Sequence, residues 1–334
     1  MPREKTKIAI ATGDPAGIGP EISLKAALDP AVRAACHPIV MSDPVVLDRH
    51  ARACGIDLDM RVIDYAGDDD GADNRLTVLD CKQPTAATLP FGAVTPEAGQ
   101  ASIAFCRMAV KAAVAGQVDA VVAAPQNETS IAQAGIKFDG HPSFVARETG
   151  TPEDDVYMML SCGGMRIAHA TLHQSVRSAI DSITRDKVTR VIRATEAALR
   201  AIGISSPRLA VSGINPHAGE GSLFGKEEIE FITPAIEAAA MLGINVCGPF
   251  GADTMFQKHD IDAFIVMLHD QGHIAAKLLA PHATIALTIG TPILFSSVAH
   301  GSAHDIAGRG VANPQAMIEA IMQLSKAKQQ ARAA

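Results

Sequence analysis

The sequence predicts an α/β protein, and two observations carry this prediction. Short apolar runs recur along the chain, and amphipathic or alanine-rich stretches of helical length separate them. Such alternation is typical of a buried, largely parallel sheet that is covered by helices. The chain has 334 residues, which suits about two domains at about 150 residues each.

The expected strands are short apolar runs, and the expected helices are the longer stretches between them. The strands are predicted at residues 7–12, 37–42, 118–125, 166–172, 208–214, 244–248, 262–269 and 283–290. The helices are predicted at residues 20–27, 95–115, 186–202, 226–242 and 314–326. Pro20 suits the start of the first helix, because a first helical turn accepts a residue that lacks an N–H group.

Composition and charge favour a small-molecule partner. Apolar residues make up 48% of the chain and charged residues 19%, as in an ordinary globular protein. The net charge of −7 offers no basic surface for nucleic acid or for an anionic membrane. No apolar run reaches the roughly 18 residues of a membrane-spanning helix. The N-terminus has no signal-peptide pattern, so we expect a cytoplasmic protein.

The six cysteines are scattered, and none forms a C-x-x-C pair. We therefore expect reduced core residues rather than disulfides or a thiolate metal site. The acidic stretch at residues 67–73 is expected to be a solvated loop. No clear linker divides the chain, so we expect a discontinuous arrangement, in which the chain leaves one lobe and later returns to it.

Residues 299–314, AHGSAHDIAGRGVANP, form the most informative segment. Its glycines at 301, 308 and 310 allow the main chain to turn and to approach a ligand closely. Its Ser, Asp and Asn side chains supply the short polar groups that such loops use for hydrogen bonds. The pattern alone fits a nucleotide-binding loop and a ligand-free glycine-rich turn equally well.

A second glycine-rich segment, GDPAGIGPEI at residues 13–22, follows the first expected strand and opens the first expected helix. The dinucleotide-binding fingerprint is incomplete here, because Pro20 and Glu21 follow Gly19 directly. We interpret the segment as a tight turn at the active site. A purely structural turn is at least as well favoured as direct ligand contact.

Three histidines predict a metal site. His173, His217 and His269 lie at the ends of separate expected strands, and strand ends in open α/β sheets converge on the ligand crevice. Three imidazoles leave coordination positions open for a substrate. His169 and His273 could bind a metal themselves if each i, i+4 pair lay on a helix. Their surroundings look like strands, so we expect His169 in the core and His273 behind the ligands.

Charged residues near these histidines are candidates for catalysis and substrate binding. Asp270 follows His269 and could orient an imidazole or relay a proton. Lys277 lies eight residues after His269, where a nearby cation could lower its pKa. Arg177 could pair with a substrate carboxylate, and a structural ion pair is an equally good interpretation. For Lys277 alone, a surface charge is the alternative.

Five motifs in order, GDPAGIGPEI, GINPHAGEG, GADTMF, MLHDQGH and HGSAHDIAGRG, resemble the 4-hydroxythreonine-4-phosphate dehydrogenase family over nearly the whole chain. The last motif also resembles the adenosine-binding loop of isopropylmalate and isocitrate dehydrogenases. The resemblance implies an isopropylmalate/isocitrate-dehydrogenase-like fold with two α/β/α lobes and a cleft between them. We expect a nucleotide-side lobe at residues 1–130 and 290–334, and a metal and dimerisation lobe at residues 131–289.

The resemblance also implies cofactors, an assembly and residue roles. It implies NAD, a divalent metal and a homodimer in which both subunits contribute to each active site. His173, His217 and His269 take the metal-ligand positions, and Lys277 takes that of a substrate-binding lysine. Three imidazoles suit zinc, while cobalt, manganese, iron and magnesium stay open. The expected cofactor-binding residues are His300, Gly301, Ser302, Ala303, Asp305, Gly308 and Asn313.

Departures from the family pattern bear on the substrate. The family's phosphohydroxythreonine enzymes bind the substrate phosphate with an Asn and an Arg, where this chain has Ala286 and Phe295. Phe offers none of the bidentate hydrogen bonds that Arg gives to phosphate. The family's GHTE motif reads GHPS at residues 140–143, which keeps His141 but loses a hydroxyl and a carboxylate.

Several local strings, including NETSIAQAGI and TLHQSVRSA, are similar to the terephthalate cis-dihydrodiol dehydrogenase branch of the family. That branch oxidises a cyclic diol dicarboxylate to protocatechuate and carbon dioxide, and an apolar Phe295 and Ala286 would suit such a ring. His141 stands where that branch has an aromatic phenol.

The expected mechanism follows from this resemblance. The metal would lower the pKa of the substrate hydroxyl, Lys277 or Asp270 would accept the proton, and hydride would pass to NAD before carbon dioxide leaves. The alternatives are a 4-phosphohydroxythreonine dehydrogenase of pyridoxal phosphate biosynthesis and a non-catalytic metal or nucleotide sensor.

Overall fold

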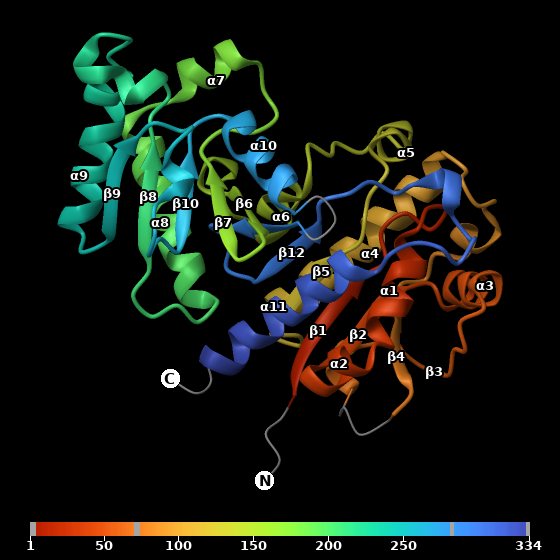
Figure 1. Cartoon of the computed structure of the whole chain (residues 1–334). Helices are drawn as coiled ribbons and strands as arrows, with labels where there is room; N and C mark the ends of the chain where they lie inside the picture. Colours follow the sequence, from red (N-terminus) through yellow and green to blue (C-terminus); the bar gives the residue numbers. More distant parts are fainter. Residues whose placement is uncertain (1–4, 70–73, 281–283, 332–334) are drawn as a thin grey trace. The chain divides into compact units, whose positions relative to one another are not determined.

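A computed structural model of the chain describes residues 5–69, 74–280 and 284–331 (Figure 1). The chain folds into two compact units. Unit 1 comprises Met1–Thr149 and Pro292–Ala334, and unit 2 comprises Gly150–Thr291. The first change of unit lies 19 residues beyond the expected boundary at residue 130, because α6 (His141–Thr149) packs on α4 (Pro96–Val114). None of the helices in the described ranges is both long and apolar enough to cross a membrane.

The sheet of unit 1 is parallel throughout. Its strands run in the order β3 (Met60–Ile63), β4 (Leu76–Asp80), β2 (Cys36–Ser42), β1 (Thr6–Ala11), β5 (Ala120–Ala123) and β12 (Phe295–Val298). The strands β2, β1 and β5 lie within or close to the expected runs. The strands β3, β4 and β12 were not predicted, because they are short and polar residues interrupt their apolar pattern.

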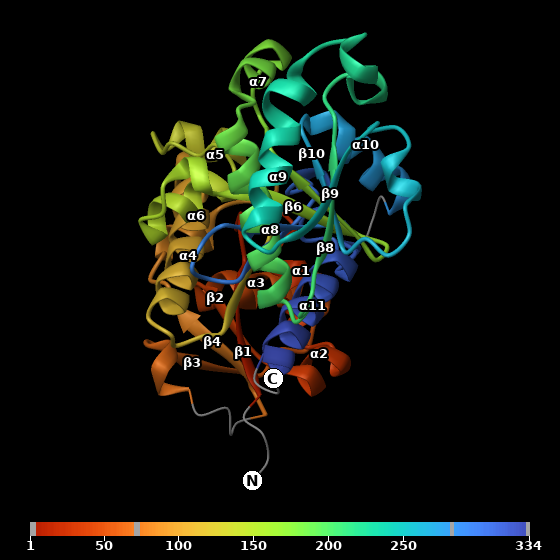
Figure 2. The ribbon, with the colours of Figure 1, turned by 90° about the vertical axis from the view of Figure 1, so that its left-hand side faces the viewer.

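Helices cover both faces of this sheet. Figure 2 shows α4 on one side of the strands, and α1 (Gly19–Ala27), α2 (Pro30–Ala35) and α11 (Gln315–Ala331) on the other. Before α2, α3 (Pro44–Cys54) and α4, a capping side chain accepts a backbone N–H, and proline occupies the first turn. Both features stabilise a helix start. The remaining helices of unit 1 are α5 (Glu128–Gln133) and α6.

The sheet of unit 2 is mixed. Its order is β11 (Ile285–Ile289), β6 (Tyr157–Cys162), β7 (Met165–His169), β10 (Ala263–Val266), β8 (Arg208–Ser212) and β9 (Asn245–Phe250). The strands β7, β10, β8 and β9 are parallel, whereas β6 is antiparallel to both its neighbours. A Gly163–Gly164 turn with φ of 53° and 84° joins β6 to β7. The strand β6 was not predicted, and residue 283 of the expected strand at 283–290 lies outside the described residues.

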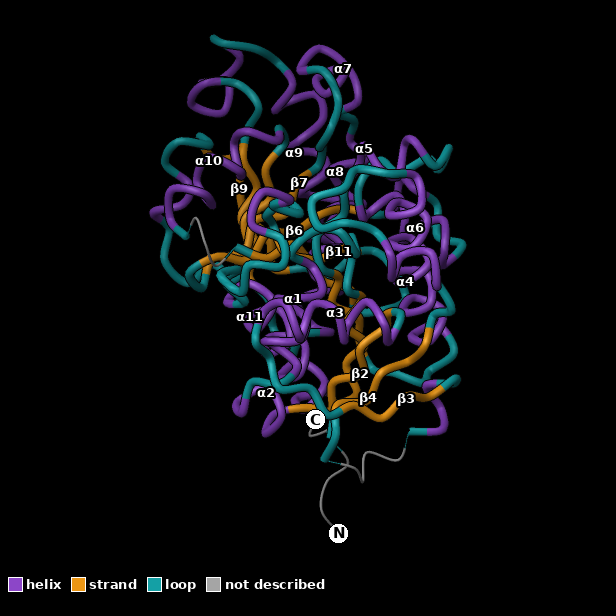
Figure 3. The backbone as a smooth tube through the Cα atoms, turned by 90° about the vertical axis from the view of Figure 1, so that its right-hand side faces the viewer, coloured by secondary structure: helices purple, strands orange, loops and turns teal. Residues whose placement is uncertain are grey.

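In unit 2, α8 (Arg185–Ala201) and α9 (Thr233–Met241) lie on one side of the strands and α10 (His269–Leu279) on the other (Figure 2). A fourth helix, α7 (Val176–Ser182), follows β7. Figure 3 draws the strands in orange and shows β2, β4 and β3 of unit 1 next to one another. The predicted strand at 262–269 was too long, because β10 ends at Val266 and α10 begins at His269. The expected helix at 226–242 begins with a π-helical turn, Glu228–Ile232, before α9.

Candidate functional site

The glycine-rich segment 299–314 joins β12 to α11 in unit 1. Its glycines differ in whether the surrounding structure requires them. At Gly308 φ is +72° and an added Cβ would lie 2.6 Å from the Phe91 ring, so the fold itself requires glycine. Gly301 has no left-handed φ, and an added Cβ would meet nothing within 4 Å. No neighbour within unit 1 therefore requires glycine at position 301, which leaves its main chain open to a ligand.

The first half of this segment is anchored to the loop after β1. His304 Nε2 lies 2.9 Å from Asp14 Oδ2, and the Ile18 amide donates to the Ser302 carbonyl at 2.9 Å. Asp14 is fully buried, and this burial raises the pKa of its carboxyl group above the usual range. An added Cβ at Gly17 would lie 2.7 Å from the Ser302 carbonyl oxygen, so glycine lets the two loops meet.

The second half of the segment is anchored to α1. The Ala312 amide donates to Glu21 Oε1 at 2.8 Å, and Lys25 Nζ donates to the carbonyls of Gly310 and Ala312 at 2.9 Å each. Lys25 also forms an ion pair with the buried Glu21 at 2.7 Å. A carboxylate and an ammonium group on successive turns of α1 therefore hold the main chain of the loop.

The seven expected cofactor-binding residues differ in accessibility. The side chain of Asn313 accepts the Gln315 amide at 3.0 Å at the start of α11, although the residue is exposed. Ser302 is buried, and Ala303 adopts a left-handed φ of 40°. His300, Gly301 and Asp305 are exposed, and Gly308 is half-buried. The exposed residues among the seven are therefore His300, Gly301, Asp305 and Asn313, and the side chain of Asn313 is already engaged at the start of α11.

In unit 2, four histidine rings form a row. His269 and His273 stack with their centroids 3.7 Å apart, and His173 lies 5.8 Å from His269. His169 lies 4.7 Å from His273, at the buried end of β7. The strand expectation for residue 269 was wrong: His269 and His273 are an i, i+4 pair on α10. His169 is fully buried, in agreement with its expected place in the core.

Burial keeps the His169 and His273 rings neutral, and a hydrogen bond fixes the orientation of the His269 ring. Burial lowers the pKa of His169 to about 3 and that of His273 to about 4. The nearby His273 lowers the pKa of His169 further, and the nearby His269 does the same for His273. His269 Nδ1 lies 2.7 Å from Asp270 Oδ1, which orients the ring and leaves Nε2 available.

His217 lies on a separate turn, Pro216–Ser222, whose backbone is unusual. Residues 217–221 all have φ between 42° and 82°, and three of them are not glycine. A left-handed conformation costs about 1–2 kcal/mol for each such residue. His217 is 65% exposed, with Nδ1 3.2 Å from Glu220 Oε2 and its ring 5.9 Å from that of Phe224. Strained backbone of this kind is common at functional sites.

The donor set fits a divalent metal in part. Two imidazoles on one tetrahedral ion place their ring centroids about 5–6 Å apart, given metal–nitrogen bonds of about 2 Å. The 5.8 Å between His173 and His269 agrees with this spacing. Within the described part of the chain, no three His, Cys, Asp or Glu side chains are grouped as a complete metal site. The structure thus brings together two of the three expected ligands and leaves His217 exposed.

The charged candidates are accessible. Lys277 lies two turns after His269 on α10, and Arg177 lies on α7 after His173. Both are exposed, and neither forms a hydrogen bond or ion pair with another residue that the structure describes. An ammonium and a guanidinium group without protein partners can bind the carboxylates or phosphate of a small molecule.

The residues expected to replace a phosphate site are buried. Phe295 is 1% exposed and belongs to the core of unit 1, and Ala286 is 9% exposed in the core of unit 2. The His141 ring packs against Phe138 and Phe295, with both centroid distances 5.5 Å. Burial lowers the pKa of His141 to about 4, and its Nε2 has no hydrogen-bond partner among the described residues.

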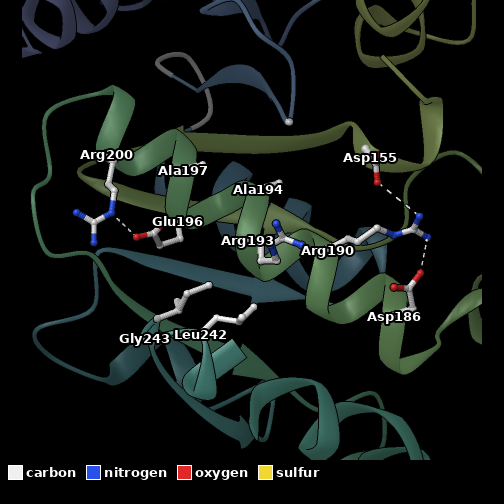
Figure 4. A pocket seen from close by; sticks show the side chains of 12 residues that line it. Asp155, Asp186, Arg190, Arg193, Ala194, Glu196, Ala197, Arg200, Leu242 and Gly243 are labelled. Atoms are coloured by element: carbon white, nitrogen blue, oxygen red, sulfur yellow. Dashed lines mark hydrogen bonds and ion pairs between the residues drawn. The ribbon is translucent and has the colours of Figure 1, made fainter. Parts of the chain in front are cut away.

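A separate hollow of about 860 Å³ runs along α8 (Figure 4). Arg190 is held by Asp155 and Asp186, and Arg200 pairs with Glu196. Three carboxylates and three arginines line the hollow, so their charges cancel and the hollow does not favour an anion. The third arginine is Arg193.

Sequence reasoning missed the residues that hold the site. Asp14 and His304 are 290 positions apart, and no local pattern links them. Glu228 accepts the amides of Ile214 and Asn215 before His217, and Gln271 accepts those of Met267 and Leu268 before His269. A usable signal for Gln271 was its place two residues after His269, where a side chain can cap a helix start.

Comparison with known proteins finds relatives that match nearly the whole chain. A family model described as pyridoxal phosphate biosynthetic protein PdxA matches residues 34–324. A 1,2-dihydroxy-3,5-cyclohexadiene-1,4-dicarboxylate dehydrogenase from Comamonas sp is 41% identical over 315 residues, covering 94% of this chain and 96% of that protein. A protein from Cutibacterium acnes, provisionally named D-threonate 4-phosphate dehydrogenase, is 41% identical over 318 residues, covering 94% and 91%.

A crystal structure of a 4-hydroxythreonine-4-phosphate dehydrogenase from Burkholderia phymatum superposes on this chain with a TM-score of 0.86 and 36% identity. The match covers 97% of this chain and 99% of that one. The family model spans most of the chain, and all three relatives are named dehydrogenases. The chain therefore belongs to the pyridoxal phosphate biosynthetic protein PdxA family.

Proposed function

We propose that this chain is a metal-dependent NAD oxidoreductase that oxidises a secondary alcohol to a β-keto acid, with a terephthalate-type cis-dihydrodiol dicarboxylate as substrate. The observation that carries the choice of substrate is the environment of Phe295. Its side chain is buried against the His141 ring. The resemblance to the family places the phosphate-binding arginine of the phosphohydroxythreonine enzymes at this position. Phe295 cannot donate a hydrogen bond to a phosphate, whereas the charge-assisted hydrogen bonds from arginine to phosphate are among the strongest in anion recognition.

The metal ligands in this proposal are His173, His217 and His269. The metal would supply Lewis-acid polarisation of the substrate's hydroxyl and carboxylate oxygens. The proposal is supported by the spacing of His173 and His269 and by the hydrogen bond between His269 and Asp270. His217 is accessible to a second subunit, so we also propose a homodimer in which the subunits share ligands.

The residues of the chain move one proton and bind the substrate's charges. Lys277 accepts the hydroxyl proton, with Asp270 as the alternative base, and Arg177 pairs with a carboxylate. NAD⁺, when bound, would supply the acceptor for the hydride of the carbinol carbon. In the resulting β-keto acid the bond to the neighbouring carboxylate breaks, its electron pair enters the ring, and protocatechuate and carbon dioxide form. Aromatisation makes this step strongly downhill.

The nucleotide site in this proposal is segment 299–314, with His300, Gly301 and Asp305 in contact with NAD. Support comes from the open space at Gly301 and from the anchoring of the loop by Asp14, Glu21 and Lys25. A preformed loop binds a ligand without an ordering cost.

A second candidate is oxidation of 4-phosphohydroxythreonine. It is favoured by the close superposition on the 4-hydroxythreonine-4-phosphate dehydrogenase. It is also favoured by the exposed Arg177, which has no ion-pair partner among the residues that the structure describes and could bind a phosphate as well as a carboxylate.

The experiment is NADH formation by metal-loaded protein with each substrate separately, and with Phe295→Leu as a variant that keeps the position apolar. Turnover of the diol alone, with release of carbon dioxide, supports the proposal. Turnover of the phosphorylated substrate alone refutes the choice of substrate and supports the second candidate.

A further inference from the structure

One edge of the His304 ring is held by the loop after β1. His304 belongs to segment 299–314, and its Nε2 lies 2.9 Å from Asp14 Oδ2. The other oxygen of this carboxylate, Oδ1, accepts the Ala16 amide at 2.8 Å. An added Cβ at Gly17 would lie 3.2 Å from His304 Cδ2, the ring carbon next to Nε2. The ring edge that carries Cδ2 and Nε2 therefore faces this loop.

The opposite edge of the ring carries Nδ1, which has no protein partner. The His304 side chain is 16% exposed, whereas that of Asp14 is 1% exposed. Nδ1 forms no hydrogen bond with another residue that the structure describes. His300, Gly301 and Asp305 in the same segment are exposed. His304 thus adds a partly accessible polar edge to the loop that we assign to the nucleotide.

Asp14 also decides which nitrogen of the neutral ring carries the proton. A carboxylate only accepts hydrogen bonds, so the proton of the neutral imidazole lies on Nε2 and is donated to Asp14. Nδ1 then carries a lone pair and can only accept. A fixed acceptor selects a ligand with an N–H or O–H group and disfavours a ligand with another acceptor at the same place.

We propose that His304 is a nucleotide-binding residue whose Nδ1 accepts a hydrogen bond from the 6-amino group of the adenine of NAD. The inference rests on the proposed assignment of segment 299–314 to the nucleotide. Because the proposed metal ligands and Lys277 belong to unit 2, the adenine end is the part of the molecule left for this loop of unit 1. Gly301 has no side chain, and the open space beside it suits a flat base. Asp14 is the positioning residue, because it sets the tautomer of His304 from the buried side.

The test is isothermal titration calorimetry of the purified full-length protein with NAD⁺ and with nicotinamide hypoxanthine dinucleotide, together with urea unfolding of the nucleotide-free protein. Hypoxanthine has a carbonyl oxygen, an acceptor, where adenine has its 6-amino group. In His304→Gln the amide lies as many bonds from Cα as Nε2 does, so it can still donate to Asp14, but no atom replaces Nδ1. The control is His259→Gln, at an exposed position of unit 2.

We expect the wild-type protein to bind NAD⁺ about 3- to 10-fold more tightly than the hypoxanthine dinucleotide, which is the contribution of one hydrogen bond. His304→Gln should lose this preference and bind NAD⁺ more weakly by the same factor. Its free energy of unfolding should stay near the wild-type value, because the bond to Asp14 is kept. His259→Gln should retain the wild-type preference.

Asp14→Asn tests the tautomer directly. The Asn oxygen can keep the bond from the Ala16 amide, which turns its Nδ2 toward His304 Nε2. An N–H donor at this place moves the ring proton to Nδ1. Nδ1 is then a donor, so we expect the preference to reverse toward the hypoxanthine dinucleotide. An unchanged preference for NAD⁺ in Asp14→Asn would overturn the positioning role.

Three other results separate the hypotheses. Wild-type affinity of His304→Gln for NAD⁺ would overturn the binding role of His304 and leave the assignment of the loop to the nucleotide intact. An equal loss of affinity for both dinucleotides in this variant would overturn the contact with the adenine amino group. Absence of NAD⁺ binding by the wild-type protein would refute the nucleotide site of the proposed function, and this inference with it.

Discussion

Replacing two glycines of segment 299–314 separates ligand binding from folding. At Gly301 an added side chain meets no protein atom within 4 Å, so Gly301→Val should change the free energy of unfolding by no more than about 0.5 kcal/mol. If NAD approaches the main chain there, the valine side chain occupies part of its space. We expect the KM for NAD to rise at least about tenfold, which corresponds to about 1.4 kcal/mol.

Gly308→Ala should behave in the opposite way. Its φ of +72° costs an alanine about 1–2 kcal/mol, and the Cβ at 2.6 Å from Phe91 adds about 1 kcal/mol by forcing the ring aside. We therefore expect a loss of about 2–3 kcal/mol in the free energy of unfolding. The KM for NAD should change less than in Gly301→Val.

The assays are urea unfolding at pH 7 and initial rates of NADH formation at varied NAD. A Gly301→Val protein of wild-type stability and wild-type KM for NAD would refute the assignment of this loop to the nucleotide. A Gly308→Ala protein of wild-type stability would show that the strain argument is mistaken.

Three further predictions concern the residues around these sites. Lys277→Met should lower kcat by about 10² or more and leave the affinity for Co²⁺ unchanged, with Lys326→Met at an exposed position as the control. A kcat within twofold of the wild-type value would exclude Lys277 as the base. His304→Ala removes the side-chain partner of the buried Asp14, so the free energy of unfolding in urea should fall by about 1–3 kcal/mol. Adding Asp14→Asn to this variant should recover part of the loss, and the absence of any recovery would contradict the pairing. Burial lowers the pKa of His50 to about 4, so the unfolded chain takes up a proton at this residue at a higher pH than the folded chain does. The free energy of unfolding should therefore fall by up to about 3 kcal/mol as the pH drops from about 6.5 to 4. Urea unfolding at pH 7 and 4.5 should show a smaller fall for His50→Gln than for the wild-type protein, and equal falls would contradict this explanation.

Much of the fold was predictable from local patterns. The central strands β1, β2 and β5 are continuous apolar runs, and the long helices α4 and α8 carry apolar residues at helical spacing. The edge strand β3 and its neighbour β4 were not predicted, because short segments interrupted by polar residues become strands only when a neighbouring strand pairs with them. The helix α10 was not predicted either, because an apolar run leads directly into His269. The start of this helix is stabilised by the Gln271 side chain, which accepts the Leu268 amide.

The candidate site divides in the same way. The sequence by itself pointed to the α/β class, to segment 299–314 and to the three histidines, because glycine, imidazole and strand-end positions are local chemical signals. Only the tertiary structure decided which groups meet. It paired Asp14 with His304 and Gln271 with the Gly213 carbonyl, placed the His173 ring 5.8 Å from that of His269, and left His217 on an exposed turn. Such contacts join residues that are distant in sequence, and they depend on strand order and crossover paths, which local periodicity does not encode.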